Sequence, residues 1–191
     1  VYGLGAIKGV GEGPVETIVQ TRAAGETFID LFDFCAKVDH KRINKRVMEA
    51  LIRSGALDSL GPFYDADEAV YLKQVDRNRA ALMAAMEEAM ASAEQTAKSA
   101  DSGHVYESYR KAREWTFKER LRGEKDTLGL YLTGHPIDEY EREIRRFARQ
   151  RILDLRPSRE SQTIAGLVFD LRVMKSKRGD KVGFVTLDDR S

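Results

Sequence analysis

Alternate glycines near the N-terminus constrain this chain more than any other feature. Gly9, Gly11 and Gly13 are separated by single residues, and Pro14 follows directly. Glycine provides the backbone freedom of a tight loop, and proline is favoured at the first position of a helix. The next residues recur at the spacing of one helix face: Val15, Ile18, Val19 and Arg22. The pattern predicts a loop whose backbone amides point outward where a helix begins.

Such a loop is suited to an anion, because unpaired amides and the positive end of the helix dipole face the ligand. The segment lacks the Gly-Lys-Ser/Thr ending of a nucleotide-binding loop, and no long apolar strand precedes it. It resembles the hairpin of a helix-hairpin-helix module, in which a Gly-apolar-Gly turn binds a phosphate of the DNA backbone. The predicted contacts are Lys8, Gly9, Val10, Gly11 and Gly13. The alternative is a glycine-rich connector without a ligand.

A second helix pair is expected before residue 60. Its first helix would carry Phe28, Leu31, Phe32 and Cys35 on an apolar face, with Thr27 as its cap. Its second helix would carry Val47, Met48, Leu51 and Ile52, and Gly55 would end it. The intervening turn has basic residues in place of glycines: Lys41, Arg42, Lys45 and Arg46. Beside a phosphate-binding loop, this cluster predicts salt-sensitive contacts with the same duplex; the alternative is a solvated surface.

The chain beyond residue 60 is predicted to be helical first and β-stranded at the end. A long Ala/Met-rich helix is expected from about Leu72 to Ala93, followed by charged helices up to residue 160, with Trp115 and Phe117 as anchors. From Thr163 the apolar period changes to two, which predicts a strand, a basic turn and a second strand. The apolar face of the first strand would hold Ala165, Leu167, Phe169, Leu171 and Val173. Two such strands suit the start of an OB-fold barrel.

Composition narrows the classes of function. The formal net charge is +1, so DNA contacts must come from local clusters of charge. Cys35 is the single cysteine and is expected to pack in the core. The three histidines, His40, His104 and His135, form no metal-binding spacing, and His135 is expected to cap or pack. No apolar run approaches the length of a membrane span. The absent initial methionine and the ending inside a predicted sheet suggest a piece of a longer cytosolic protein.

Several blocks together resemble one family. They are Tyr2 to Pro14, Ser54 to Asp58, Thr127 to Pro136 and Val185 to Ser191. In this order they closely resemble the C-terminal part of the bacterial DNA polymerase III alpha subunit, the replicative polymerase. The resemblance implies a mainly α fold, divided into a tandem helix-hairpin-helix region (1–60), a long helix and loop (61–104), the helical remainder of a clamp-binding region (105–160) and the first strands of an incomplete OB-fold barrel (161–191).

The resemblance also implies partners and a place of action. Duplex DNA, the sliding clamp and other replicase subunits would be the partners, with single-stranded DNA as a further ligand of the OB domain. The protein would act in the bacterial cytoplasm, without a membrane. The family's catalytic aspartates and Mg²⁺ belong to the palm domain, which no block here resembles. We therefore expect neither a catalytic centre nor a cofactor in these residues.

One departure from the family concerns the clamp. A short exposed peptide with glutamine, leucine or methionine, and phenylalanine is expected after the Ala-rich helix, but residues 100–106 contain none. We expect a mobile segment to be missing near His104, because such peptides become ordered only on binding. Arg113 to Phe117 has aromatic character, but it is predicted to be helical and is a poor substitute. The stretch from Phe63 to about Asn78 is longer than the family leads us to expect.

Two other classes of function are alternatives. A protein-interaction module would use the same helix pairs for packing and the same charges to meet a protein. An independent nuclease or glycosylase with a helix-hairpin-helix unit is disfavoured, because no carboxylate cluster, metal set or nucleophile with a base is evident in the sequence.

Overall fold

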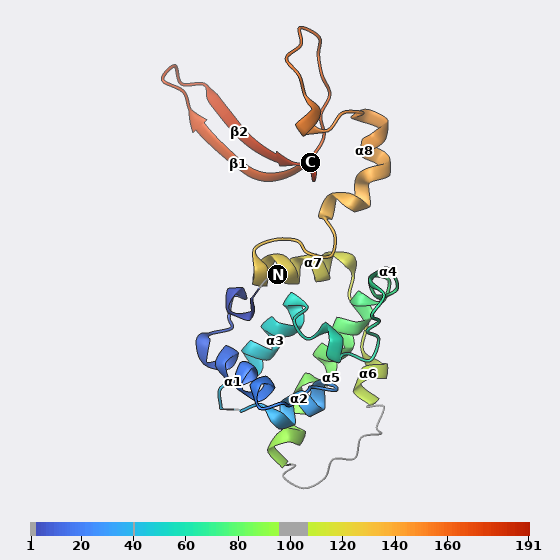
Figure 1. The fold of residues 1–191 in the computed structure, drawn as a ribbon. Helices are drawn as coiled ribbons and strands as arrows, with labels where there is room; N and C mark the ends of the chain where they lie inside the picture. The colour runs from blue at the N-terminus through green and yellow to red at the C-terminus, as the bar shows by residue number, and fades with distance from the viewer. Residues whose placement is uncertain (1–2, 40, 96–106) are drawn as a thin grey trace. The chain divides into compact units, whose positions relative to one another are not determined.

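The computed structural model describes residues 3–39, 41–95 and 107–191 (Figure 1). The chain forms two compact units, residues 1–133 and residues 134–191. Helices dominate the first unit, and the second contains an antiparallel pair of strands. This confirms the mainly α prediction with strands at the end, whereas the four-part division by domain stays a prediction. Among the described helices, none has the length and apolar character needed to cross a bilayer.

The first helix pair consists of a short 3₁₀ helix, η1 (Leu4–Ala6), and α1 (Glu12–Ala23). Gly11 is the N-cap of α1, so the helix begins two residues before Pro14. The prediction that Pro14 occupies the first helical position was therefore wrong. Proline is tolerated at its actual position because the first four amides of a helix have no partner within it.

The second helix pair consists of α2 (Leu31–Lys37) and α3 (Lys45–Ser54). Asp30, and not Thr27, caps α2, because its carboxylate accepts a hydrogen bond from the amide of Asp33 at 2.8 Å. Phe28 consequently lies outside the helix, although it still packs against the core. The predicted inner face of α3 is confirmed: Val47, Met48, Leu51 and Ile52 are buried.

The core of the first unit is centred on α5 (Val75–Gln95), which packs against α2, α3 and α6 (Glu107–Lys111). Alanines on the inner side of α5 allow this close approach, and Ala81, Ala85 and Ala89 are fully buried. Cys35 is buried in the same core. Burial, with a smaller effect from the charge of Asp30, raises the pKa of its thiol to about 12. Core packing without reactivity therefore suits this cysteine.

The long helix begins later than its sequence suggested. A 3₁₀ turn, η2 (Asp58–Leu60), and a single helical turn, α4 (Glu68–Tyr71), precede it. The carboxylate of Asp67 caps α4 and thereby starts a separate helix. Leu72, expected on the buried face of the long helix, lies after α4 and is 40% exposed. The unexplained stretch from Phe63 to Asn78 thus contains α4 and the start of α5.

The last helix of the first unit is α7 (Phe117–Leu128). Thr116 and Glu119 form a capping box at its start, and Gly129 ends it with φ +78°. Residues 112–116 are not helical, so the helix predicted across Arg113 to Phe117 was wrong at those positions. Trp115 is partly buried against the core, as expected of an anchor.

The second unit begins with η3 (Pro136–Tyr140), α8 (Glu141–Phe147) and η4 (Ile152–Asp154). The expectation of helix up to residue 160 was wrong, because α8 ends at Phe147. His135 is a cap, as predicted. Its Nδ1 accepts a hydrogen bond from the amide of Ile137 at 3.3 Å, and the Asp138 carboxylate accepts one from the amide of His135 at 2.9 Å. Its Nε2 lies 3.2 Å from a carboxylate oxygen of Asp188.

Strands β1 (Leu167–Lys175) and β2 (Lys181–Asp188) pair antiparallel across a turn. The register shifts between Val168 and Asp170, which indicates a bulge at Phe169. Because a bulge reverses the alternation of faces, Val168 and not Phe169 shares a face with Leu171 and Val173. The apolar face predicted from strict alternation was therefore wrong on the N-terminal side of the bulge.

Candidate nucleic-acid interface

The glycine hairpin has buried residues that anchor it to the core and exposed glycines at the surface. Ile7 and Val10 are buried, and the amide of Val10 donates to the carbonyl of Ile7 at 3.0 Å. The amide of Lys8 donates to the carbonyl of Thr127 in α7 at 2.8 Å. Gly9, between the buried Ile7 and Val10, is exposed and has φ +92°, a backbone conformation that residues with a Cβ rarely adopt. The buried flanking residues therefore fix the loop and leave Gly9 at the surface.

The backbone amides at the start of α1 are available to a ligand. Within the described residues, no hydrogen-bond acceptor is recorded for the amides of Gly9, Gly11, Glu12 and Gly13. Their position at a helix N-terminus adds the positive end of the dipole. The carboxylate of Glu12 is exposed at the same end and reduces the attraction for an anion there.

The predicted basic cluster of the second hairpin divides into two kinds of residue. The guanidinium of Arg42 lies 3.2 Å from Glu16 and 3.9 Å from Asp39, and the ammonium of Lys45 pairs with Glu87. For Lys41 and Arg46, no carboxylate partner is recorded in the described part of the chain. Ion pairs between exposed side chains contribute little to stability. Lys41 and Arg46 thus carry the positive charge that is not already balanced.

The two hairpins share one open hollow on the surface. It is lined by Gly9, Val10 and Gly11 from the first hairpin and by Asn44, Arg46 and Val47 from the second. Of the predicted contacts, the hollow therefore unites Gly9, Val10 and Gly11 with Arg46. Gly13, Lys41, Arg42 and Lys45 do not line it.

Lys8 lies apart from this hollow. Its ammonium is close to Gly129, which ends α7. The C-terminal end of a helix dipole attracts a cation. A local role in holding the hairpin against α7 is therefore an alternative to the predicted DNA contact.

Asn44 is a site residue that sequence reasoning missed. Its side-chain oxygen caps α3 by accepting a hydrogen bond from the amide of Val47 at 3.1 Å, and the residue also lines the hollow. An asparagine directly before an apolar helical pattern is a recognised start signal. That signal could have placed Asn44 next to the basic cluster.

A buried ionic network lies in the first unit, outside the hollow. Arg79 on α5 is 1% exposed and binds the Asp58 carboxylate with Nε and Nη2, at distances of 2.8 to 3.1 Å. Its Nη1 donates to Glu124 on α7 at 2.9 Å. The other carboxylate oxygen of Glu124 accepts from the amides of Leu132 and Thr133 at 2.7 and 3.0 Å. The network joins η2, α5, α7 and the end of the first unit.

The environment of Glu124 keeps it ionised. Burial acts to raise the pKa of its carboxyl group, but hydrogen bonds from Thr133 and Leu132 and the charge of Arg79 outweigh burial. The pKa of Glu124 is consequently lower than its ordinary value. No pattern in the sequence signals this network, because its members are far apart along the chain.

No cluster of three or more His, Cys, Asp or Glu side chains suited to a metal ion occurs among residues 3–39, 41–95 and 107–191. His40, the histidine beside the basic cluster, lies outside these ranges, as do His104 and the stretch in which the clamp-binding peptide was expected.

Each of the two hairpins joins a pair of helices, and both hairpins line the same hollow. Residues 1–64 match a family model described as a helix-hairpin-helix motif. This match covers both hairpins and the hollow between them. It confirms the class predicted from the glycine loop.

The whole chain is also similar to one segment of larger curated proteins. The whole chain is 66% identical to DNA polymerase III subunit alpha of Pseudomonas fluorescens, 65% to that of Pseudomonas aeruginosa and 44% to that of Escherichia coli K12. These residues are homologous to one segment of DNA polymerase III subunit alpha. The chain spans 17% of the length of the first relative and 18% of the second. The alignments run over 205 to 207 positions, so the relatives contain residues that this chain lacks.

Proposed function

We propose that the chain is a duplex-DNA-binding region of a bacterial replicative polymerase and holds the duplex that leaves the active site. The observation that carries the proposal is the shared hollow, where the free amides of Gly9 and Gly11 lie beside Arg46. Amides and a guanidinium are suited to a backbone phosphate. Contacts of this kind position a protein on DNA without reading the base sequence.

Several finer parts of the proposal rest on the relatives and on the resemblance of the sequence. They are binding to the sliding clamp and to other replicase subunits, an OB-fold barrel that begins with β1 and β2 and takes single-stranded DNA, and action in the cytoplasm. DNA synthesis, with its Mg²⁺, would belong to the palm domain of the complete subunit. The residues of this chain would bind and position DNA.

Removing Lys41 and Arg46 should weaken duplex binding. In the double variant Lys41→Ala/Arg46→Ala, the slope of log affinity against log salt should become shallower by about two, since each phosphate contact contributes about 0.9. Fluorescence anisotropy with a labelled duplex between about 50 and 200 mM salt measures this slope.

A matched double variant, Arg42→Ala/Lys45→Ala, removes the same charge from the same hairpin. These side chains already have carboxylate partners in Glu16 and Glu87, so the slope should change less. An unchanged slope in Lys41→Ala/Arg46→Ala would contradict the proposal.

Gly9→Ala should reduce duplex binding without removing any charge. An added Cβ has room, since its nearest neighbour would be the Cβ of Ala50 at 3.7 Å, but φ +92° is strained for alanine. The loop should therefore change shape and misplace its amides, with about tenfold weaker binding, equal to about 1.4 kcal/mol.

Gly25→Ala is the control for Gly9→Ala. Gly25 has a similar φ of +88° and open space around it, and it lies outside the hollow. Its duplex affinity should equal that of the unaltered chain. Equal losses in the two variants would show that general strain, and not the hairpin, reduces binding.

A protein-interaction module remains the second candidate. The pairing of Arg42 with Glu16 and of Lys45 with Glu87 favours it, because two of the four basic side chains are already neutralised within the chain and have less charge to offer DNA. Separate titrations of the chain with short duplexes and with purified replicase subunits distinguish the two functions. Binding to a protein that Lys41→Ala/Arg46→Ala abolishes, with no duplex binding, would favour the module.

A further inference from the structure

Helix α8 in the second unit has two sides of different electrostatic character. Between residues 142 and 151 the sequence has five arginines and one acidic residue, Glu143. The inner side of α8 borders a hollow to which Ile144, Arg145 and Ala148 contribute. The opposite side of the helix carries Arg142, Arg146 and Phe147, together with the exposed carboxylate of Glu143.

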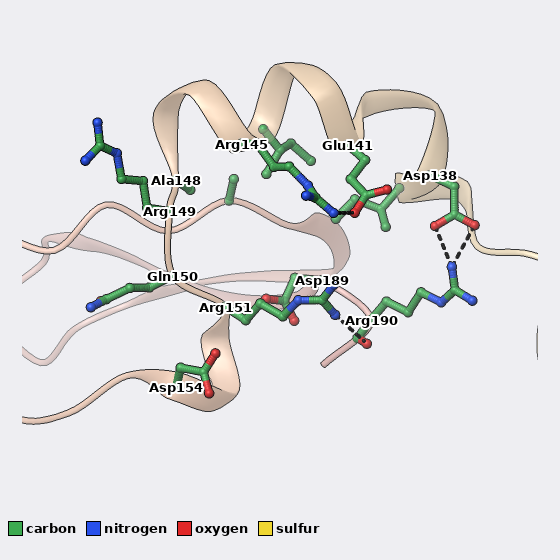
Figure 2. Close-up of a pocket in the computed structure, with 13 residues that line it drawn as sticks. Asp138, Glu141, Arg145, Ala148, Arg149, Gln150, Arg151, Asp154, Asp189 and Arg190 are labelled. Carbon is green, nitrogen blue, oxygen red and sulfur yellow. Dashed lines mark hydrogen bonds and ion pairs between the residues drawn. The ribbon is translucent and has the colours of Figure 1, made fainter.

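Several of the charges around the hollow are paired within the protein, as Figure 2 shows. Arg145 pairs with Glu141, and Arg190 binds both carboxylate oxygens of Asp138 at 2.8 and 3.0 Å. Arg151 donates to the carbonyl of Arg190 at 3.5 Å. Arg149 also lines the hollow, and no carboxylate partner is recorded for it in the described part of the chain.

Three exposed arginines differ from these, two on the opposite side of α8 and one, Arg149, at the edge of the hollow. Arg142, Arg146 and Arg149 are exposed, and no carboxylate partner is recorded for them in the described part of the chain. In Figure 2 the guanidinium of Arg149 extends away from the other labelled arginines and no dashed line reaches it. Arg142 and Arg146 are four residues apart, so they lie on the same side of α8 with a rise of about 6 Å between them.

An exposed aromatic residue, Phe147, directly follows Arg146 at the end of α8. Phe147 is 75% exposed, although it belongs to the residue types that proteins usually bury. Guanidinium groups bind phosphates through two parallel hydrogen bonds and also stack on planar groups. An exposed ring among positive charges is the arrangement on which the bases of a single strand stack.

We propose that Arg142, Arg146, Phe147 and Arg149 form a binding surface for single-stranded nucleic acid, separate from the two hairpins. The arginines contact the backbone phosphates, and the ring of Phe147 stacks with an unpaired base. A duplex fits less well, because its bases are stacked within the helix and cannot reach the ring. The surface does not depend on the function proposed for residues 8–46.

The test uses the 191-residue chain and a fluorescein-labelled oligothymidine in anisotropy titrations at several salt concentrations. The triple variant Arg142→Ala/Arg146→Ala/Arg149→Ala should bind at least about tenfold more weakly at low salt. Its salt slope should become shallower by about two, because each phosphate of a single strand contributes about 0.7.

Phe147→Leu should weaken binding about tenfold with an unchanged slope, because it removes stacking and keeps the charge.

Two controls distinguish binding at this surface from binding at the hairpins and from a general loss of structure. Lys41→Ala/Arg46→Ala should keep its affinity for oligothymidine, so that failure of the hairpin proposal would leave this result intact. Circular dichroism should show unchanged helix content in all variants, since the replaced side chains are exposed.

Wild-type affinity and slope in the triple variant would overturn the proposal. So would polyglutamate that competes as well as unlabelled oligothymidine, because it would show a surface for acidic protein.

Discussion

Glu124→Ala is expected to lower the free energy of unfolding of the first unit by about 3 to 5 kcal/mol, the usual effect of removing one partner from a buried ion pair. The carboxylate is fully buried and accepts hydrogen bonds from Arg79, Leu132 and Thr133. Without it, Arg79 keeps Asp58 as a partner, but its Nη1 and two backbone amides lose their acceptor. A loss of this size is a large fraction of the stability of a small domain.

Urea denaturation followed by tryptophan fluorescence measures this effect. Trp115 is the single tryptophan and belongs to the first unit, so its signal reports on that unit alone. Asp126→Ala is the matched control, because Asp126 is on the same helix and forms an exposed pair with Arg122 at 3.8 Å. It should change stability by less than about 0.5 kcal/mol. Equal effects of the two substitutions would contradict the role assigned to Glu124.

The pH dependence of this effect has a definite sign. The folded pKa of Glu124 is lower than its ordinary value, so the unfolded chain binds a proton at this residue more readily than the folded chain. Its contribution to stability is thus fully present above about pH 4.3, the ordinary pKa of glutamate, and is lost as the pH falls through the lower folded value. The difference between the unaltered chain and Glu124→Ala should therefore persist at about pH 5 and decrease only in more acidic buffer.

The helix pairs could be predicted from sequence because their determinants are local. The inner face of α3 follows from four apolar residues at helical spacing, and Gly55 ends the helix directly after its last turn. The predictions from sequence were wrong where two nearby residues could both cap a helix, and where strand pairing changed the alternation of side chains. Asp30 replaced Thr27 as a cap, and the bulge at Phe169 changed the face of the strand residues before it.

The candidate site could be predicted only as far as its local pattern extends. The glycine loop and the basic turn were evident, but the partners of the basic residues were not. Glu16 and Glu87 lie 26 and 42 residues from the cations that they neutralise. Contacts over such separations depend on how helices pack, which periodicity does not specify. For the same reason the network of Asp58, Arg79 and Glu124 has no sequence signature.

Gly55→Ala should be about as damaging as the loss of Glu124, with a decrease of about 4 kcal/mol in the free energy of unfolding. Two effects add at this position. Gly55 ends α3 with φ +83°, which is strained for any residue with a Cβ. An added Cβ would also lie 2.3 Å from Nη2 of Arg79 and 2.8 Å from a carboxylate oxygen of Asp58, so it would force the buried ion pair apart.

Gly25→Ala separates the two effects, because Gly25 has φ +88° and no heavy atom within 4 Å of an added Cβ. It should show the strain alone, about 1 to 2 kcal/mol. The difference between the two variants, measured by the fluorescence of Trp115 in urea, then isolates the displacement of Arg79 from Asp58. If both substitutions lower the free energy of unfolding equally, Arg79 and Asp58 can shift to admit the added Cβ at no cost in stability. Gly55 would then be needed only for its backbone conformation.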